Sequence, residues 1–512
     1  VKAFTWLPQQ FFPHSTRPEV LVDLTLAQNA SIFDADRVSK RVDAILAQDR
    51  DVDHWSSYVG QGAIRFYLPL DQQLANDFFA QTVVVTKGDK ERERVIARLN
   101  ERLAREFPEA VCRVSTLELG PPVGWPVQFR MTGPDADKVQ AFARKAADIV
   151  RRDPDIAQTC FDWGEKQRKL VLKIRQEEAR RLGLSSSAAA QLAYAAVTGV
   201  SVTKVRDDIY LVDVIFRADK ETRTSIEAVR NLDIQLKDGA SVPMSVIADA
   251  AYVQDYPLVW SRDRRPTVTI KSQVLPGVLG EVAAARIGKK LADYAGTLPQ
   301  GYRIDPAGST EESAKSSASV MATIPYMIML MLVVLMIQLQ DFRHLFLVVV
   351  VAPAGLIGVV LGLGISGNPM GFVALLGIVA LIGMIIRNSV ILVHQIGVEK
   401  KPGVSEWDAL VEAATVRCRP IMLTAVAAIL GMLPIAPTVF WGPMANAIMG
   451  GLAVATVLTL LFLPALYVWW FGLKEEHSEG PGSCDKGETA AEATSRPDEA
   501  PAAGTDRSLP EI

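Results

Sequence analysis

The chain has 512 residues, which is too long for one ordinary domain and predicts about three. Its 54 Lys and Arg residues nearly balance its 57 Asp and Glu residues, so the net charge of −3 indicates no polyanionic partner such as nucleic acid. Residues 1–319 carry charges every few positions, whereas residues 320–473 contain long uncharged runs. This asymmetry excludes intrinsic disorder for most of the chain, and it excludes a purely soluble protein.

Cysteine and histidine give no sign of a disulfide or metal framework. Cys112, Cys160, Cys418 and Cys484 lack paired spacing, and the five histidines are scattered, so we expect no metal site. The sequence begins at Val1 without a signal or targeting motif, which suggests a processed chain or a fragment.

A strand–helix–strand pattern recurs four times in the first 308 residues. The predicted units are 20–26, 34–48 and a strand from 52; 78–86, a helix ending at 107 and 110–117; 127–132, a helix ending at 152 and 156–161; and 267–274, 280–298 and 302–305. In the second helix Val95, Leu99, Leu103 and Phe107 form one apolar face, which only a sheet can bury. Pairs of these units predict two split-βαβ, ferredoxin-like modules.

The predicted fold class is an α+β region followed by an all-α bundle. In chain order we expect a link at 1–13, a first module at 14–118, the first part of a second module at 119–162, an inserted subdomain at 163–258, the second part at 259–308, a membrane domain at 309–473 and a disordered cytoplasmic tail at 474–512. The insertion has helix signals at 176–184 and 187–197 and a hairpin signal near Asp207-Asp208.

Five apolar stretches are long enough to cross a bilayer, which takes ~20 helical residues. They are predicted at 320–339, 345–365, 371–396, 421–440 and 446–471. Lysines and arginines lie at one set of ends, whereas the opposite loops at 366–370 and 440–444 have none. The positive-inside rule therefore places the charged ends and the tail in the cytoplasm, and residues 1–319 on the other side. An amphipathic stretch at 405–416 predicts a helix on the cytoplasmic membrane surface.

Arg387 is a single cation near the middle of the third predicted span. An arginine at this depth costs at least ~2.5–3.5 kcal/mol on insertion scales, so it requires protein, water or an anionic partner. The five predicted spans contain no Asp or Glu, and we therefore expect the partner on helices outside this sequence. The alternative is that the side chain extends to the membrane surface.

Other candidate residues carry less specific signals. Thr424, four residues after Pro420, either contributes to a site around Arg387 or bonds to a carbonyl of its own helix. Arg417 either anchors the cytoplasmic end of the fourth span or has a functional role. Six aromatic residues are candidates for an apolar ligand pocket, although their strand spacing also suits a core: Trp55, Tyr58, Phe66, Tyr67, Phe78 and Phe79.

The sequence contains no recognisable catalytic motif, so we do not expect an enzyme. Residues 362–367 match GxGxxG, but the match closes a membrane span instead of opening a βαβ helix, and we interpret it as a packing feature.

This organisation resembles the C-terminal half of a resistance-nodulation-division (RND) exporter, in the multidrug, acriflavine-resistance branch. The similarity extends to about Leu473 and is strongest at Phe12-Pro13, 261–266 (SRDRRP), 383–392 and 417–424 (RCRPIMLT). It implies that the two modules are porter subdomains, that the insertion is half of a docking domain, and that the spans are family helices eight to twelve. The family's first half and its seventh helix are then absent from this sequence.

The resemblance also assigns roles to the membrane residues. The family is driven by protons, and two neighbouring Asp residues pair with a Lys on the tenth helix near a Thr on the eleventh. Arg387 occupies the Lys position with Asn388 beside it, Thr424 the Thr position, and Arg417 that of a conserved Arg. Because arginine effectively cannot lose its proton, we expect Arg387 to be a permanent counter-charge to acidic residues on the missing half.

The function implied by the resemblance is proton-coupled export of amphipathic or hydrophobic compounds (drugs, biocides, detergents) across the inner membrane. It implies a homotrimer with a periplasmic adaptor, an outer-membrane channel and no cofactor. Two alternatives are a membrane-anchored periplasmic assembly or binding module without transport, and RND export of metal or lipid cargo. A metal cargo would need paired Met or carboxylate ligands in the cleft.

Overall fold

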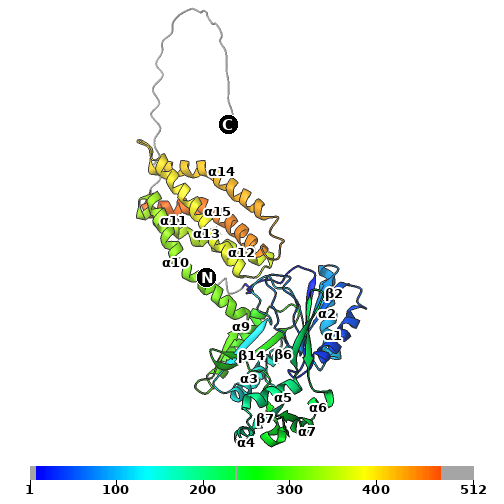
Figure 1. Ribbon diagram of the computed structural model, residues 1–512. Coiled ribbons are helices and arrows are strands. Elements are labelled where there is room, and N and C mark those ends of the chain that lie inside the picture. Colours follow the sequence, from blue (N-terminus) through cyan, green and yellow to red (C-terminus); the bar gives the residue numbers. More distant parts are fainter. Residues whose placement is uncertain (1–6, 237–238, 474–512) are drawn as a thin grey trace, which may run out of the picture.

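The computed structural model describes residues 7–236 and 239–473. The tail at 474–512, predicted to be disordered, and residues 1–6 of the predicted link lie outside the described residues. A mixed α/β region up to residue 308 is followed by a bundle of long helices, and Figure 1 shows the two at opposite ends of the molecule.

The first sheet has four antiparallel strands in the order β2–β3–β1–β4. The strands are β1 (Glu19–Thr25), β2 (Val52–Val59), β3 (Phe79–Thr86) and β4 (Val111–Thr116). Helices α1 (Ile32–Leu46) and α2 (Asp89–Glu106) cover one face, where Leu99 and Leu103 pack against strand residues such as Val22 and Val84. The alternation of apolar and polar strand residues leaves the opposite face with Asp23, Gln81 and Arg113 among its side chains.

The second sheet repeats this arrangement, with β6–β14–β5–β15 in the order of the first. It consists of β5 (Val127–Thr132), β6 (Ile156–Phe161), β14 (Arg265–Val274) and β15 (Arg303–Ala307), with a short β13 (Ser261–Arg262) paired to β14. Helices α3 (Ala136–Arg151) and α9 (Gly280–Ala295) bury their apolar faces in its core. Two split-βαβ modules are therefore confirmed, with the chain leaving the second module between β6 and β14.

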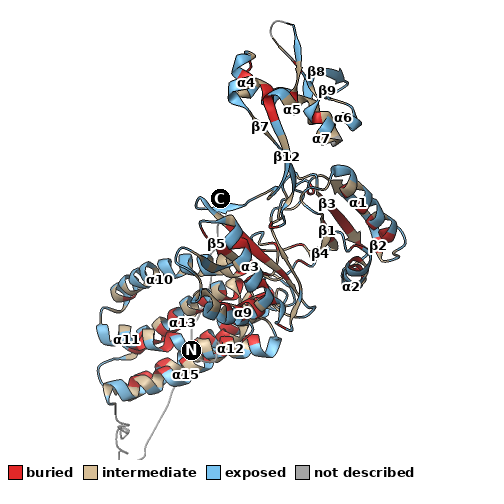
Figure 2. Ribbon diagram, turned by 90° about the horizontal axis from the view of Figure 1, so that it is seen from below, coloured by how far each residue is buried: buried red, intermediate tan, exposed pale blue. Residues whose placement is uncertain are grey.

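The segment between β6 and β14 forms a separate subdomain that projects away from both sheets (Figure 2). Its stem is an antiparallel pair, β7 (Gln167–Ile174) and β12 (Ala248–Asp255). Beyond the stem it contains α4 (Gln176–Arg181), α5 (Ser186–Val197), β8 (Val200–Asp207), β9 (Tyr210–Phe216), α6 (Lys220–Thr224), α7 (Ile226–Arg230), β10 (Asp233–Gln235), β11 (Ser241–Pro243) and α8 (Met244–Ile247). Ile234, Met244 and Ile247 are central to its own small core, and the β8–β9 hairpin predicted near Asp207 is present.

Five helical segments among the described residues are long and apolar enough to cross a membrane. They are α10 (Ser309–Leu339), α11 with α12 (Phe342–Val351 and Gly355–Ser366, joined by a 3₁₀ turn at Ala352–Ala354), α13 (Phe372–Glu399), α14 (Glu406–Met432) and α15 (Gly442–Phe471). This confirms the expected bundle of five apolar helical segments.

Two helices differ from the predicted boundaries. Helix α10 begins at Ser309 rather than near 320, because the polar first turns contain no helix breaker and a search for apolar runs cannot detect them. Helix α14 joins the predicted surface helix at 405–416 to the fourth span, since Pro420 removes only one backbone donor. It ends at Met432 rather than 440, where Pro434 and Pro437 lack the N–H groups that would continue it.

Glu311 holds the start of α10 against the second sheet. Its carboxylate is hydrogen-bonded to Arg130 of β5 and, at 2.8 Å, to Arg262 of β13. Lys315, one turn further along α10, lies 3.0 Å from the same carboxylate. The helix is therefore fixed to the sheet by a charge cluster around Glu311, whose side chain is only 16% exposed.

The centre of the bundle is a close contact between α12 and α15. A Cβ atom on Gly362 would lie 2.5 Å from the carbonyl oxygen of Asn446, so only glycine allows the two backbones to approach this closely. The GxGxxG match at 362–367 therefore includes a packing glycine.

Candidate functional site

Arg387 lies near the middle of the 28-residue helix α13, with an exposed side chain. The next two residues, Asn388 and Ser389, are only 4% and 0% exposed, so they face the bundle interior. Arg387 therefore lies on the opposite, outward side of the helix. Among residues 7–236 and 239–473, Arg387 has no hydrogen bond or ion pair. A cation placed this way in an apolar helix requires a partner from outside the described bundle or from water.

Arg387 belongs to an uncovered stripe along α13, referred to below as the α13 stripe. It consists of Leu376, Ala380, Gly383, Arg387, Ile391, His394 and Val398. These residues are spaced three or four apart, so they share one face of the helix. A Cβ on Gly383 would meet nothing within 4 Å in the described chain. Small residues one and two turns before Arg387 thus leave room for another helix to approach it.

Thr424 and Arg417 both lie on α14 but bond differently. The hydroxyl of Thr424 donates to the carbonyl of Ile421 at 2.9 Å, which is the local bond that a helical Thr commonly makes. Arg417 donates to the side-chain oxygen of Gln395 on α13 through Nε at 3.0 Å and Nη2 at 2.6 Å. Arg417 therefore connects α14 to α13 at Gln395, eight residues after Arg387. The side chain of Thr424 is exposed on α14.

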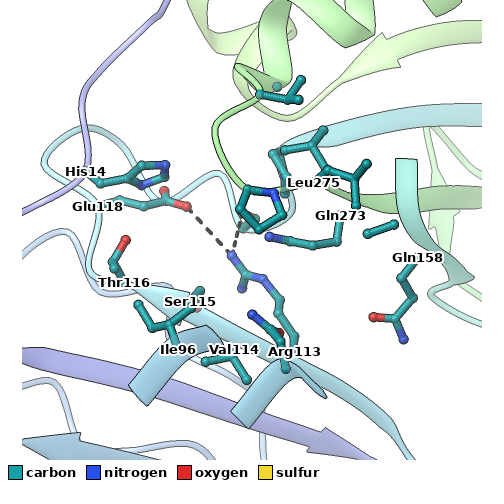
Figure 3. A pocket seen from close by; sticks show the side chains of 18 of the residues that line it. His14, Ile96, Arg113, Val114, Ser115, Thr116, Glu118, Gln158, Gln273 and Leu275 are labelled. Atoms are coloured by element: carbon teal, nitrogen blue, oxygen red, sulfur yellow. Dashed lines mark hydrogen bonds and ion pairs between the residues drawn. The ribbon is translucent and has the colours of Figure 1, made fainter. Parts of the chain in front are cut away.

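A cavity of about 780 Å³ lies between the two modules, and residues 10–14, which run next to the helical bundle, form part of its wall. Its wall comes from α2 and β4 of the first module, from β6 and the β14–α9 connection of the second, and from the segment 118–126 that joins them. Apolar lining residues include Phe12, Ile96, Phe107, Val114, Val274, Leu275 and Leu279. Figure 3 shows Arg113 in the middle of the cavity, between Glu118 and Gln273.

Arg113 is a largely buried charged residue of this cavity (Figure 3). It lies opposite Asp23 in the β1–β4 register, and its side chain is only 9% exposed. Its Nη1 donates to Asp23 Oδ2 at 3.4 Å and its Nη2 to the carbonyl of Gly124 at 2.7 Å, while Glu118 Oε1 lies 3.9 Å from Nη2. The Nε atom is buried and has no hydrogen-bond partner among the described residues.

Burial sets the protonation of the groups around Arg113. It raises the pKa of Glu118 and of Asp23, while the positive charge of Arg113 acts in the opposite direction on both. Burial also lowers the pKa of His14 on the cavity wall, with Arg113 and Arg92 adding to the effect. His14 is therefore neutral at physiological pH, and one guanidinium is shared between two carboxyl groups.

An aromatic cluster connects the cavity to the helical bundle. The ring of Phe12 lies 5.7 Å from that of Phe372 at the start of α13 and 6.0 Å from that of Phe440, measured between centroids. On its other side Phe12 is pressed against Gly120 of the cavity wall, where a Cβ would lie 2.4 Å from Phe12 Cδ2. The helix that carries Arg387 therefore contacts the cavity wall through Phe12 and the neighbouring Phe11, whose ring lies 6.4 Å from that of Phe372.

None of the six predicted pocket aromatics lines this cavity. Trp55 packs against the core beneath the helices, and Tyr58 and Tyr67 pack against a small cluster on the other face of the first sheet. Phe79 is only 6% exposed, Phe78 is half-buried, and Phe66 is 39% exposed. Their role as a ligand pocket stays a prediction.

Sequence reasoning did not select the residues that do line the cavity. Arg113, Glu118 and Gln273 lie in segments that were recognised only as strands and connections between modules. One signal was present: Arg113 interrupts the apolar strand 110–117 at a position that faces away from the helices. The pairing of this face with a second module is a tertiary feature, which strand alternation cannot reveal.

Comparison with known proteins agrees with this architecture. A family model described as the AcrB/AcrD/AcrF family matches residues 1–470. The multidrug resistance protein MdtC of Serratia proteamaculans (strain 568) is 24% identical over 484 residues, which are 93% of this chain and 46% of that protein. Two X-ray crystal structures of a heavy metal efflux pump, crystal forms I and II, give TM-scores of 0.70 and 0.69 at 20% identity; each comparison covers 92% of this chain, and 49% and 50% of those chains.

These matches establish a family and a length relationship. The family model extends over both sheets, the inserted subdomain and all five apolar helical segments. The chain spans about half the length of the relatives that it matches. With the family model matching 470 consecutive residues, the chain belongs to the AcrB/AcrD/AcrF family.

Proposed function

We propose that this chain supplies the C-terminal half of a proton-driven exporter of amphipathic and hydrophobic organic compounds. The observation that carries the proposal is Arg387, a mid-helix cation on an uncovered stripe of α13, without a partner in the described chain. A charge at this depth is costly to insert, which points to a functional role for Arg387. The bundle belongs to a family of transporters, which provides the function.

Arg387 acts in this proposal as a fixed counter-charge. Its partners are carboxylates on helices of the remaining half, which pack against the α13 stripe where Ala380 and Gly383 allow close approach. When these carboxylates take up protons, their attraction to Arg387 disappears and α13 is free to shift. Phe12 conveys the shift to the cavity wall through its contacts with Phe372 and Gly120.

The cavity between the two sheets is the proposed site for the exported compound. Its volume of about 780 Å³ is within the range of pockets for drug-sized molecules, and most of its lining is apolar. MdtC carries the description of a multidrug resistance protein, which agrees with organic cargo, whereas the heavy metal efflux pumps share the fold. Organic cargo is favoured because the described residues of the cavity lining include no methionine, and because the described chain has no cluster of three His, Cys, Asp or Glu side chains that could hold a metal ion.

The proposal places the protein in the inner membrane, with the two sheets in the periplasm and the end of α14 at Glu406 in the cytoplasm. The proposed assembly is a trimer that works with a periplasmic adaptor and an outer-membrane channel. The inserted subdomain projects from the sheets at the end remote from the bundle, which is where such partners would be reached (Figure 2).

Efflux of a fluorescent amphipathic cation from cells tests the proposal. Cells that express the full-length protein with Arg387→Ala should retain the dye at the level of cells without the protein, because the carboxylates lose their counter-charge. Arg343→Ala is the matched control, since Arg343 is an exposed arginine in the first turn of α11. Undiminished proton-dependent efflux by Arg387→Ala, at equal expression, would refute the proposed role.

A further inference from the structure

Two buried polar atoms, on residues that line the cavity, have no hydrogen-bond partner among the described residues. One is Nε of Arg113 on β4, and the other is the side-chain oxygen Oε1 of Gln273 on β14. Both side chains line the cavity, and they come from different modules. A buried donor or acceptor without a partner costs about 1–3 kcal/mol, so this pair requires an explanation.

The surroundings of the two atoms define what could satisfy them. Arg113 offers a donor, and it is held in position by Asp23 and the Gly124 carbonyl through its other nitrogens. Gln273 offers an acceptor, and it is opposite Gln158 in the β14–β6 register. The cavity wall also contains apolar residues, among them Val114, Leu275 and Val278, and the polar residues Ser115 and Thr116. A group that accepts from Arg113 and donates to Gln273 would pair both atoms once the two side chains rotate to turn these buried atoms toward the cavity.

The two carboxyl groups around Arg113 disfavour an anion as the ligand group. One guanidinium already faces two carboxyl groups, Asp23 at 3.4 Å and Glu118 at 3.9 Å. A carboxylate on the ligand would add a third negative group to this cluster, at a cost that low polarity increases. A neutral carbonyl oxygen avoids this repulsion and still accepts a charge-assisted hydrogen bond.

We propose that Arg113 and Gln273 form a polar subsite for apolar compounds that carry a neutral carboxamide. The carbonyl oxygen accepts from Arg113 Nε, and the adjacent N–H donates to Gln273 Oε1. The inference rests on the proposed function, because it names the substrate class of the cavity already assigned to the exported compound. Arg113 and Gln273 are specificity-determining residues in this scheme.

Three naphthalene compounds with one ring system and different head groups test the subsite. They are naphthalene-2-carboxamide, methyl naphthalene-2-carboxylate and the naphthalene-2-carboxylate anion. Binding to the full-length protein in detergent is followed by naphthalene fluorescence, with empty detergent micelles as the blank. We expect the carboxamide to bind about 10-fold more tightly than the ester, which lacks the donor for Gln273.

Variants separate the two contacts. Gln273→Leu should abolish the difference between amide and ester, and Arg113→Lys, which keeps the charge but removes Nε, should weaken both about 10-fold. Gln158→Leu is the matched control, because Gln158 lines the same cavity on the neighbouring strand without an unpaired buried atom. Thermal unfolding of each variant identifies any loss of folding, and Gln273→Leu alone is sufficient to decide the outcome.

Each contrary result has a distinct meaning. Tighter binding of the carboxylate than of the amide would overturn the assignment of a neutral head group. Equal binding of all three compounds, unaffected by either variant, would overturn the subsite and leave water as the partner of both atoms. A bulky cation without a carbonyl, tetraphenylphosphonium, is included in the same assay. Its binding and efflux would uphold the proposed function if the subsite fails, and its failure to bind or be exported would count against that function.

Discussion

Gly358 of α12 and Gly450 of α15 are in direct backbone contact. A Cβ on Gly358 would lie 2.3 Å from the carbonyl oxygen of Gly450, and a Cβ on Gly450 would lie 2.6 Å from the carbonyl oxygen of Gly358. The contact is reciprocal, so neither helix can accept a side chain here without moving the other. Apolar tails surround the bundle in a membrane, and close packing of this kind replaces the hydrophobic effect as the source of helix association.

Substitution of Gly358 by Val should therefore separate α12 from α15. We expect a loss of about 1–3 kcal/mol, which is typical of overpacking in a tight core, and a lower thermal unfolding midpoint in detergent. Gly364→Val is the control, because a Cβ on Gly364 of the same helix meets nothing within 4 Å. Equal midpoints for the two variants would show that the contact has no role in stability.

A buried carboxylate in the second module makes its stability depend on pH. Hydrogen bonds from Arg286 hold the pKa of Asp153 below its usual range, and Lys290 lies 3.5 Å away. Since the folded pKa is the lower one, the stabilisation is complete above the unfolded pKa of about 3.9 and is lost as the pH falls through the folded value.

We expect Asp153→Asn to lower the unfolding midpoint at pH 7 and to flatten the decline of the midpoint as the pH falls below about 4. The control is Asp148→Asn, since Asp148 forms an exposed pair with Arg151 at 2.9 Å and pairs of that kind contribute little. A parallel decline in Asp153→Asn and the unaltered protein would remove Asp153 from the pH dependence.

Phe12 should separate compound binding from transport. Phe12→Ala removes the contacts with Phe372, Phe440 and Gly120 but leaves Arg113 and Gln273 in place. We expect efflux to fall at least several-fold while the affinity for tetraphenylphosphonium changes less than 2-fold. Phe346→Ala is suitable as the control, because Phe346 stacks on Trp470 at the far end of the bundle. A parallel fall in binding and efflux would assign Phe12 to the cavity alone.

Cys112 reports directly on occupancy of the cavity that it lines. Burial raises the pKa of Cys112 to about 12, so at pH 8 roughly one thiol in ten thousand is ionised. We expect alkylation by iodoacetamide to be slow and to accelerate about 10-fold for each pH unit between 7 and 9. Bound tetraphenylphosphonium should slow it further, as measured by mass spectrometry of the Cys112 peptide. Unchanged labelling at saturating tetraphenylphosphonium would place the compound elsewhere.

The apolar periodicity of the sequence predicts the individual helices and strands of this protein, but it does not predict the cavity. Residues 127–132 and 156–161 were predicted as strands, and they are strands within those limits, because alternation and flanking turn residues act over a few positions. Arg387 was recognisable because a charge in an apolar run needs no tertiary information. Arg113, Gln273 and Glu118 meet only after two modules pack together, and their separation in sequence conceals this. The start of α10 at Ser309 was missed for a different reason: its first turns are polar.

The junction between β15 and α10 has a mechanical consequence. The strand ends at Ala307 and the helix begins at Ser309, so Gly308 is the only residue between them. Helix α10 has 31 residues and is thus about 46 Å long at 1.5 Å per residue. If the helix tilts by about ten degrees about its Leu339 end, the Ser309 end moves by roughly 8 Å, given that length. The one-residue connection is short, and Glu311 is bound to Arg130 and Arg262 of the second sheet. A tilt of α10 would therefore move the second sheet together with the Ser309 end of the helix.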